Sequence, residues 1–158
     1  MPVLRLADYL RADLVFTDLP LLAKDAFLGA FAAAVVERID GLDGDDLLGR
    51  LLAREAQQST GIGGGLALPH AMVPGLARTH LAVSRLDSGI DFAASDSLPT
   101  DLFFLLLGPP EAAREHLRVL ARVARVLDVE STLARLRQAP DAAEIHRLLL
   151  AEDALHVY

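Results

Sequence analysis

The stretch from Leu102 to Leu107 constrains the fold of this 158-residue chain more than any other. It holds six consecutive apolar residues and is followed at once by Gly108-Pro109-Pro110, which cannot continue a regular strand. Successive side chains of a strand point to opposite faces, so a strand that is apolar at every position needs cover on both of them. We therefore predict a buried strand over residues 101–107, in a sheet with helices on both sides.

The rest of the chain alternates between helical and strand-like patterns. Further strands are predicted at residues 13–17, 66–68 and 80–86. Helices are predicted at residues 21–38, 47–57, 111–127, 131–138 and 141–151. This alternation predicts an α/β sandwich with a mixed central β-sheet flanked by helices. We find no internal repeat, linker or low-complexity segment, and we expect one domain over residues 1–158.

Two of the predicted helices carry polar residues on or beside their apolar faces. In the helix at 47–57, Arg54 is in phase with Leu47 and Leu51, which places it at the edge of the buried face. In the helix at 111–127, His116 is in phase with inward-facing apolar residues and lies near the start of the helix. The main apolar face of that helix is expected at residues 113, 117, 120, 124 and 127, and an arginine face at residues 114, 118, 122 and 125.

Composition excludes several classes of function. The chain has no cysteine, which excludes disulfides, thiolate metal sites and a cysteine nucleophile. Its formal net charge of −7 argues against nucleic acid as a partner, because duplex binding depends on Lys and Arg neutralising phosphates. The longest apolar run, residues 27–36, is about half as long as a membrane span, so the chain is not expected to be membrane-embedded. The N-terminal residues lack a secretion signal, and we expect a cytoplasmic protein.

The segment Ser59-Thr60-Gly61-Ile62-Gly63-Gly64-Gly65 cannot continue the preceding helix and is predicted to be a loop. Glycine-rich backbone can approach a ligand closely and turn its amides toward an anion. Two nucleotide-binding motifs fail here, because the segment has no lysine and because Leu66 stands where a dinucleotide fingerprint needs glycine. The segment can be interpreted either as a phosphate-binding loop or as a flexible connector. The candidate phosphate-binding residues are Ser59, Thr60, Gly61, Gly63 and Gly65.

His70 follows Pro69 at the end of the short apolar strand predicted at 66–68. A neutral imidazole has an unprotonated ring nitrogen that can attack phosphorus. Phosphoryl transfer also needs fixed donors or cations around the nucleophile, and Arg54 and His116 are candidates to supply them. The alternative is that these are structural side chains, with Arg54 lying over the core and both histidines buried in it.

The order of motifs along the chain resembles a known family. The pattern Arg-Glu-x4-Ser-Thr-Gly-Ile-Gly-x-Gly-x-Ala-x-Pro-His, from Arg54 to His70, is similar to the signature of the IIA component of the phosphoenolpyruvate-dependent phosphotransferase system, fructose/mannitol/nitrogen-regulatory class. The resemblance covers about residues 4–152. Weaker matches follow in the same order at residues 89–92, 101–106, 108–109 and 116–121.

The resemblance implies a phosphotransferase component with a phosphohistidine intermediate. His70 would be the phosphorylated residue, and Arg54 and His116 its active-site partners. The donor would be the histidine phosphocarrier protein of the same system. The acceptor would be a IIB domain, or, in nitrogen-regulatory relatives, a target protein would respond to the phosphorylation state. No organic cofactor and no metal are expected. One departure is Met72, at a position that is often basic in relatives.

Overall fold

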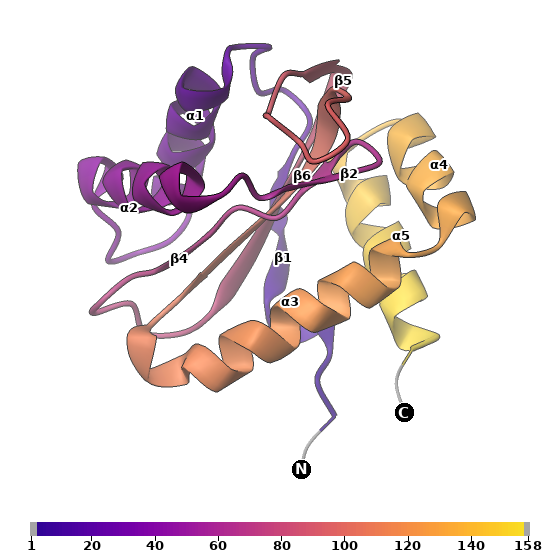
Figure 1. Ribbon diagram of the computed structural model, residues 1–158. Helices are drawn as coiled ribbons and strands as arrows, with labels where there is room; N and C mark the ends of the chain where they lie inside the picture. The colour runs from indigo at the N-terminus through magenta and orange to yellow at the C-terminus, as the bar shows by residue number, and fades with distance from the viewer. Residues whose placement is uncertain (1–2, 157–158) are drawn as a thin grey trace.

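The computed structural model describes residues 3–156, which form a mixed six-stranded sheet with helices on both faces (Figure 1). This confirms the predicted α/β sandwich. Residues 1–2 and 157–158 of the expected domain lie outside the described part. Within residues 3–156, no helix is both long enough and apolar enough to cross a membrane.

The sheet is built around β6, which is buried along almost its whole length. β6 pairs with β5 on one side in antiparallel fashion, and with β3 and β4 on the other side in parallel fashion. The order is β1-β5-β6-β3-β2, with β4 beside β6 as well. The strands are β1 (Leu10–Phe16), β2 (Gly61–Gly63), β3 (Leu66–Ala67), β4 (His70–Met72), β5 (His80–Ile90) and β6 (Thr100–Gly108).

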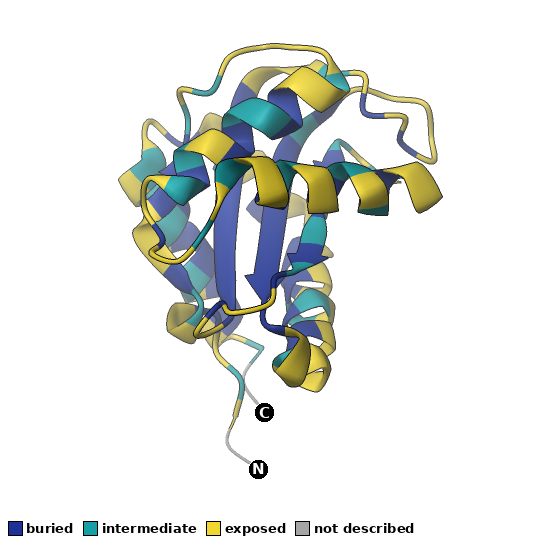
Figure 2. Ribbon diagram, turned by 90° about the vertical axis from the view of Figure 1, so that its left-hand side faces the viewer, coloured by how far each residue is buried: buried dark blue, intermediate teal, exposed yellow. Residues whose placement is uncertain are grey.

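The helices form a layer on each face of the sheet (Figure 1). The two layers are α1 (Lys24–Val36) with α2 (Gly44–Gln57), and α3 (Ala113–Leu127) with α4 (Glu130–Gln138) and α5 (Ala142–Ala154). Short 3-10 turns occur at η1 (Leu6–Asp8) and η2 (Pro110–Ala112). Figure 2 shows the strands as buried and the outer faces of the helices as exposed.

The apolar run in β6 serves both layers, as predicted. Phe103, Leu105 and Leu107 belong to the core under α1 and α2. Residues 102, 104 and 106 belong to the core under α3, α4 and α5. The alternation of side chains along a strand divides one apolar stretch between two cores. This is why no polar residue is tolerated from 102 to 107.

The predicted apolar face of α3 is wrong except at Leu127, which is buried. The structure buries His116, Val119, Val123, Val126 and Leu127, and it leaves Leu117 67% exposed. Helical periodicity is compatible with two apolar stripes, one through the valines and one through the alanines and leucines. Periodicity alone does not show which of the two stripes is buried. The inward direction of His116 was predicted correctly. Three of the four arginines are exposed, whereas Arg122 is partly buried in an ion pair with Asp153.

The prediction that residues 59–65 form only a loop is also wrong. Gly61–Gly63 is a strand, and it pairs with Leu66–Ala67 in a tight antiparallel hairpin. Gly64 and Gly65 make the turn with φ values of 66° and 80°, a region that residues with a Cβ rarely adopt. A Cβ at Gly65 would also lie 2.4 Å from the guanidinium of Arg137. The glycines therefore permit a packed hairpin where the pattern suggested irregular structure.

Candidate active site

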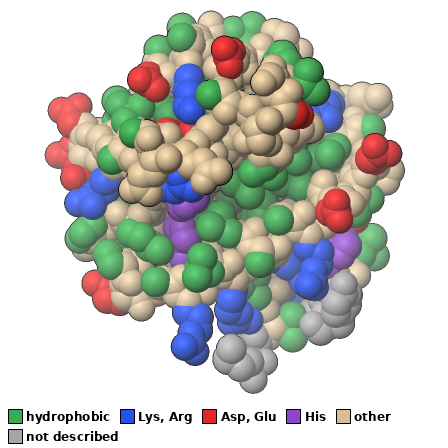
Figure 3. Space-filling model, viewed as in Figure 1, with side chains coloured by type: hydrophobic (Ala, Val, Ile, Leu, Met, Phe, Trp, Pro, Cys, Tyr) green, Lys and Arg blue, Asp and Glu red, His purple; other side chains and the backbone are tan. Residues whose placement is uncertain are grey.

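Arg54, His70 and His116 meet at one place, although they lie on three separate elements. Arg54 is in the last turn of α2, His70 begins β4, and His116 is in the first turn of α3. Arg54 Nε lies 3.2 Å from His70 Nε2, and the two imidazole ring centroids are 5.6 Å apart. In Figure 3, histidine side chains lie in a hollow of the surface beside a basic side chain.

The sheet places His70 at this point. β4 runs parallel to β6 with His70 opposite Leu106, and the amide of Leu106 donates to the carbonyl of Pro69. These backbone contacts fix the chain on both sides of the imidazole. α2 packs against β4, and its C-terminal end brings Arg54 to the ring. The Arg54 guanidinium also donates to the carbonyl of Gln58, just beyond the end of that helix, at 2.8 Å.

The hydrogen bonds of His70 decide which of its ring nitrogens carries the proton. Arginine can only donate, so Nε2 of His70 must accept from Arg54 Nε through its lone pair. The carbonyl of Leu68 can only accept, so Nδ1, at 2.9 Å, must donate to it. Both contacts require the neutral tautomer with hydrogen on Nδ1. His70 is half-buried, and its reactive lone pair is on Nε2.

His116 is in the opposite situation. It is 1% exposed, and neither of its ring nitrogens has a hydrogen-bond partner within residues 3–156. Burial, followed by repulsion from His70, lowers the pKa of His116 from 6.5 to about 4. The ring is therefore neutral near pH 7 and has one N–H group without an acceptor. A buried donor without a partner is costly.

The candidate phosphate-binding residues contact other parts of the protein. The amide and hydroxyl of Thr60 donate to the carboxylate of Glu55, and the hydroxyl of Ser59 donates to the carbonyl of Phe92. The hairpin residues Gly61, Gly63 and Gly65 lie against residues 94, 96, 101 and 137. Within residues 3–156, no hydrogen bond joins the segment 59–65 to the ring of His70. The turn of the hairpin is also about 13 Å away along β6, since Leu66 pairs with Leu102 and His70 with Leu106.

Sequence reasoning missed Glu55 as a site-forming residue. Glu55 is 8% exposed, and its carboxylate contacts Lys24 Nζ at 2.8 Å as well as Thr60. It therefore ties α1 and the start of the glycine-rich segment to the helix end that carries Arg54. The signal was present in the sequence, because Glu55 follows Leu47 and Leu51 at four-residue spacing on the buried face of α2.

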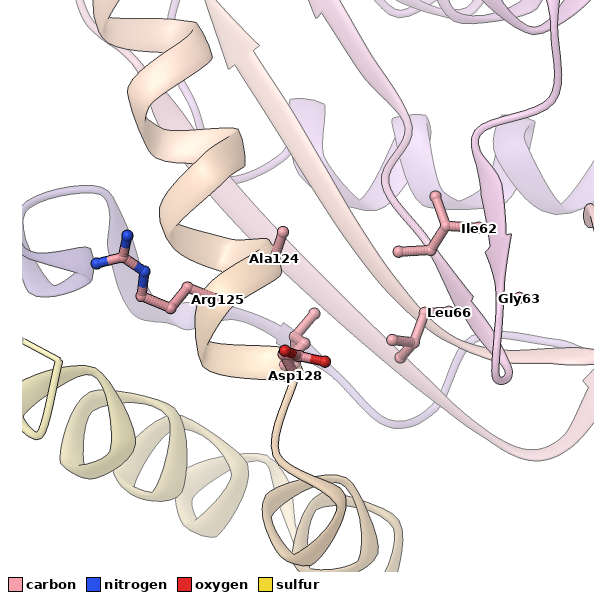
Figure 4. A pocket seen from close by; sticks show the side chains of 7 residues that line it. Ile62, Gly63, Leu66, Ala124, Arg125 and Asp128 are labelled. Carbon is pink, nitrogen blue, oxygen red and sulfur yellow. The ribbon is translucent and has the colours of Figure 1, made fainter.

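An open groove runs between α3 and the β2–β3 hairpin and has a volume of about 580 Å³ (Figure 4). Ile62 and Leu66 line one wall, and Ala124 and Leu127 line the other. The exposed apolar stripe of α3 borders the same side of the molecule. Ile62 is 49% exposed and Leu117 67% exposed, so apolar surface is available close to the segments that carry His70 and His116.

Within the described residues, no group of three or more His, Asp or Glu side chains is arranged to hold a metal ion. The chemical groups that converge are a guanidinium, an imidazole with a fixed lone pair and a neutral buried imidazole. This combination suits a nucleophile together with donors for an anionic group.

Comparison with known proteins gives a consistent result. A family model described as "Phosphoenolpyruvate-dependent sugar phosphotransferase system, EIIA 2" matches residues 8–152. A nitrogen regulatory protein of Pseudomonas aeruginosa is 34% identical over 148 residues, which cover 94% of this chain and 96% of that protein. A fructose-specific EIIA component of Haloferax volcanii is 34% identical over 71% of each chain.

Solved structures share the fold. The crystal structure of the nitrogen regulatory protein IIA-Ntr from Neisseria meningitidis superposes with a TM-score of 0.84 and 29% identity, and it covers 90% of this chain and 97% of that one. The IIA mannitol enzyme of Escherichia coli, solved in complex with phosphorylated IIB mannitol, gives a TM-score of 0.73 at 19% identity. It covers 90% of this chain and 99% of that one, and at this identity it supports the fold alone.

Proposed function

The chain belongs to the EIIA 2 family of the phosphoenolpyruvate-dependent sugar phosphotransferase system, and from this membership we propose that it carries a phosphoryl group on Nε2 of His70. The family and the similar proteins support a phosphocarrier role. The observation that carries the choice of atom is the pair of hydrogen bonds on His70. They leave a lone pair on Nε2 and hold hydrogen on Nδ1.

In the proposed step, the Nε2 lone pair of His70 attacks the phosphorus atom of a phosphohistidine on the donor protein. The new N–P bond forms as the donor's N–P bond breaks, and the electron pair of the broken bond returns to the donor's imidazole. No proton has to move, because Nδ1–H stays on the carbonyl of Leu68. Arg54 moves off the lone pair as phosphorus arrives.

Arg54 and His116 stabilise the charge that develops on the equatorial phosphoryl oxygens. The guanidinium supplies a permanent positive charge within 3.2 Å of the attacking atom. The neutral ring of His116 supplies an N–H donor from a dry position, where a hydrogen bond is stronger than in water. The phosphoryl group in turn provides the acceptor that His116 lacks in the unphosphorylated protein.

The glycine-rich segment has a supporting role in this proposal. The amide of Leu68 donates to the carbonyl of Thr60, and the carbonyl of Leu68 accepts from His70. Residues 59–65 thereby hold the backbone group that sets the tautomer of His70. Of the candidate residues Ser59, Thr60, Gly61, Gly63 and Gly65, Thr60 thus supports the phosphoryl site through Leu68.

The proposed donor is a histidine phosphocarrier protein, and the proposed acceptor is a IIB domain. The exposed apolar groove between α3 and the β2–β3 hairpin lies about 13 Å along the sheet from His70 and offers the exchanging protein a docking surface. Membership of the EIIA 2 family supports an acceptor within the same phosphotransferase system, and we propose the cytoplasm as the place of the exchange.

Intact-protein mass spectrometry after incubation with a phosphorylated donor carrier tests the assignment. We expect one phosphate on the wild type and on His146→Ala, which keeps all three site residues, and none on His70→Ala. A His70→Ala protein that still accepts one phosphate would refute the proposal.

A second candidate function is regulation without sugar transport, in which other proteins bind according to the phosphorylation state. The similarity to nitrogen regulatory proteins over almost the whole chain favours it. A phosphoryl group adds about two negative charges at the surface around His70, which is enough to repel acidic or apolar partners.

A pull-down with phosphorylated and unphosphorylated protein separates the two functions. Regulation predicts at least one partner that is bound in only one state, whereas simple transfer predicts a shared set of exchange partners. Identical partners in both states would count against regulation.

A further inference from the structure

Something other than direct hydrogen bonds must hold His116 in place. Both of its ring nitrogens are buried without a partner, so no hydrogen bond within residues 3–156 fixes the orientation of the ring. An imidazole with no polar anchor can turn about its Cβ–Cγ bond and exchange nitrogen for carbon. For a phosphoryl site, the ring must present its N–H in one direction.

A carboxylate next to His116 in sequence ties the first turn of α3 to the sheet. Glu115 Oε2 accepts from the hydroxyl of Tyr9 at 3.1 Å, and Glu115 Oε1 accepts from the hydroxyl of Thr79 at 3.1 Å. Tyr9 directly precedes β1, and Thr79 directly precedes β5. Two strand ends are thus joined to one helix end through a single side chain.

The same hydroxyl of Thr79 and the ring of His116 both lie beside Gly108. A Cβ at Gly108 would lie 2.9 Å from Thr79 Oγ1 and 3.5 Å from His116 Nδ1. The two groups therefore face one small space, which exists because residue 108 has no side chain. Thr79 is 1% exposed, so water does not compete for its hydroxyl.

The hydroxyl of Tyr9 remains a donor under all ordinary conditions. Burial, together with the hydrogen bond to Glu115, raises the pKa of Tyr9 to about 12. A protonated phenol and a threonine hydroxyl both donate to Glu115, and an ionised carboxylate is the acceptor that satisfies two donors at once. The arrangement is complete before any phosphoryl group arrives.

We propose that Glu115, Tyr9 and Thr79 are positioning residues, which hold the ring of His116 in the direction required to meet a phosphoryl group on His70. The proposal rests on the proposed function of His70. The three residues act through the position of the α3 first turn and through the space beside Gly108. None of them touches the phosphoryl group.

Thr79→Val tests this, because valine keeps the volume of threonine and removes the hydroxyl. We expect phosphoryl transfer to slow about tenfold, since a small misplacement of a stabilising group costs that much or more. Thr79→Ser restores the hydroxyl and should recover most of the rate. Thr100→Val is the matched control, because Thr100 is also fully buried on the sheet and its hydroxyl has no partner.

A second measurement does not depend on phosphorylation. Nitrogen-15 NMR of the unphosphorylated protein should show shifted or broadened ring signals of His116 in Thr79→Val, and unchanged ring signals in Thr100→Val. Wild-type transfer together with unmoved His116 signals in Thr79→Val would overturn the proposal. So would a Thr79→Ser protein that is as slow as Thr79→Val at equal melting temperature.

Failure of the proposed function would look different. If the wild type accepts no phosphate on His70, the phosphocarrier assignment is lost, while the NMR comparison still shows whether Thr79 orients His116.

Discussion

The helices α2 and α3 each deliver one group to His70, but from opposite ends and in opposite states. Arg54 comes from the C-terminal end of α2, where the helix dipole favours a positive charge and free carbonyls accept hydrogen bonds. His116 comes from the N-terminal end of α3, where the dipole disfavours a protonated imidazole. The site therefore combines a satisfied cation with an unsatisfied neutral donor.

The largest effect should separate the two groups by their charge. Arg54→Gln removes the cation and should slow phosphoryl transfer to His70 by about 10²–10³-fold, the typical cost of losing a preorganised electrostatic contact. His116→Gln keeps an uncharged N–H donor and should slow transfer only about tenfold. A neutral hydrogen bond is about half as strong as one made by a charged group. Single-turnover transfer rates measure both. Equal losses of transfer rate in the two variants would show that the charge of Arg54 gives it no larger role than His116.

The pH dependence of stability should report the burial of His116, together with that of His80, whose pKa burial also lowers. The pKa of His116 is about 4 in the folded protein and near 6.5 when unfolded, so the unfolded chain binds more protons between these values. Stability is then fully present above pH 6.5 and is lost as the pH falls toward 4, by about 3 kcal/mol. His116→Gln should flatten that part of the curve in urea unfolding at several pH values. An unchanged slope would show that His116 does not titrate in this way.

The two apolar stripes of α3 should differ strongly in their contribution to stability. Val123→Ala opens a cavity under the sheet and should cost about 2 kcal/mol. Leu117→Ala, on the exposed stripe, should change the free energy of unfolding by less than about 0.5 kcal/mol. Chemical denaturation of both variants measures this. A larger loss for Leu117→Ala would mean that α3 is rotated from the position described.

The smallest effect concerns how the two helices begin. The side chain of Asp43 accepts from the amides of Asp45 and Asp46 and so caps α2, whereas the capping position of α3 makes no side-chain hydrogen bond. Asp43→Ala should cost about 1 kcal/mol in thermal unfolding. Asp43→Asn, which keeps the accepting oxygen, should cost much less. An equal loss of stability in the two variants would show that the charge of Asp43, and not its capping hydrogen bonds, stabilises the helix.

The same two helices show how far sequence reasoning reached. In α2, the apolar spacing and the edge position of Arg54 point the same way, and the structure agrees. In α3, two stripes were both apolar, and the chosen one is exposed. The glycine-rich segment was read as irregular, because positive φ values permit a loop and a tight hairpin equally well. A local sequence pattern predicts the structure of a segment only when a single arrangement of that segment satisfies the pattern.

The sequence by itself determined the buried central strand, the alternation of helices and strands, and the motif from Arg54 to His70. These follow from hydrophobic period and residue order, which are local properties of the chain. Only the tertiary structure decided the tautomer of His70, the isolation of His116 and the meeting of Glu115 with Tyr9 and Thr79. These depend on contacts between residues up to 106 positions apart, and no local pattern encodes where two such side chains meet.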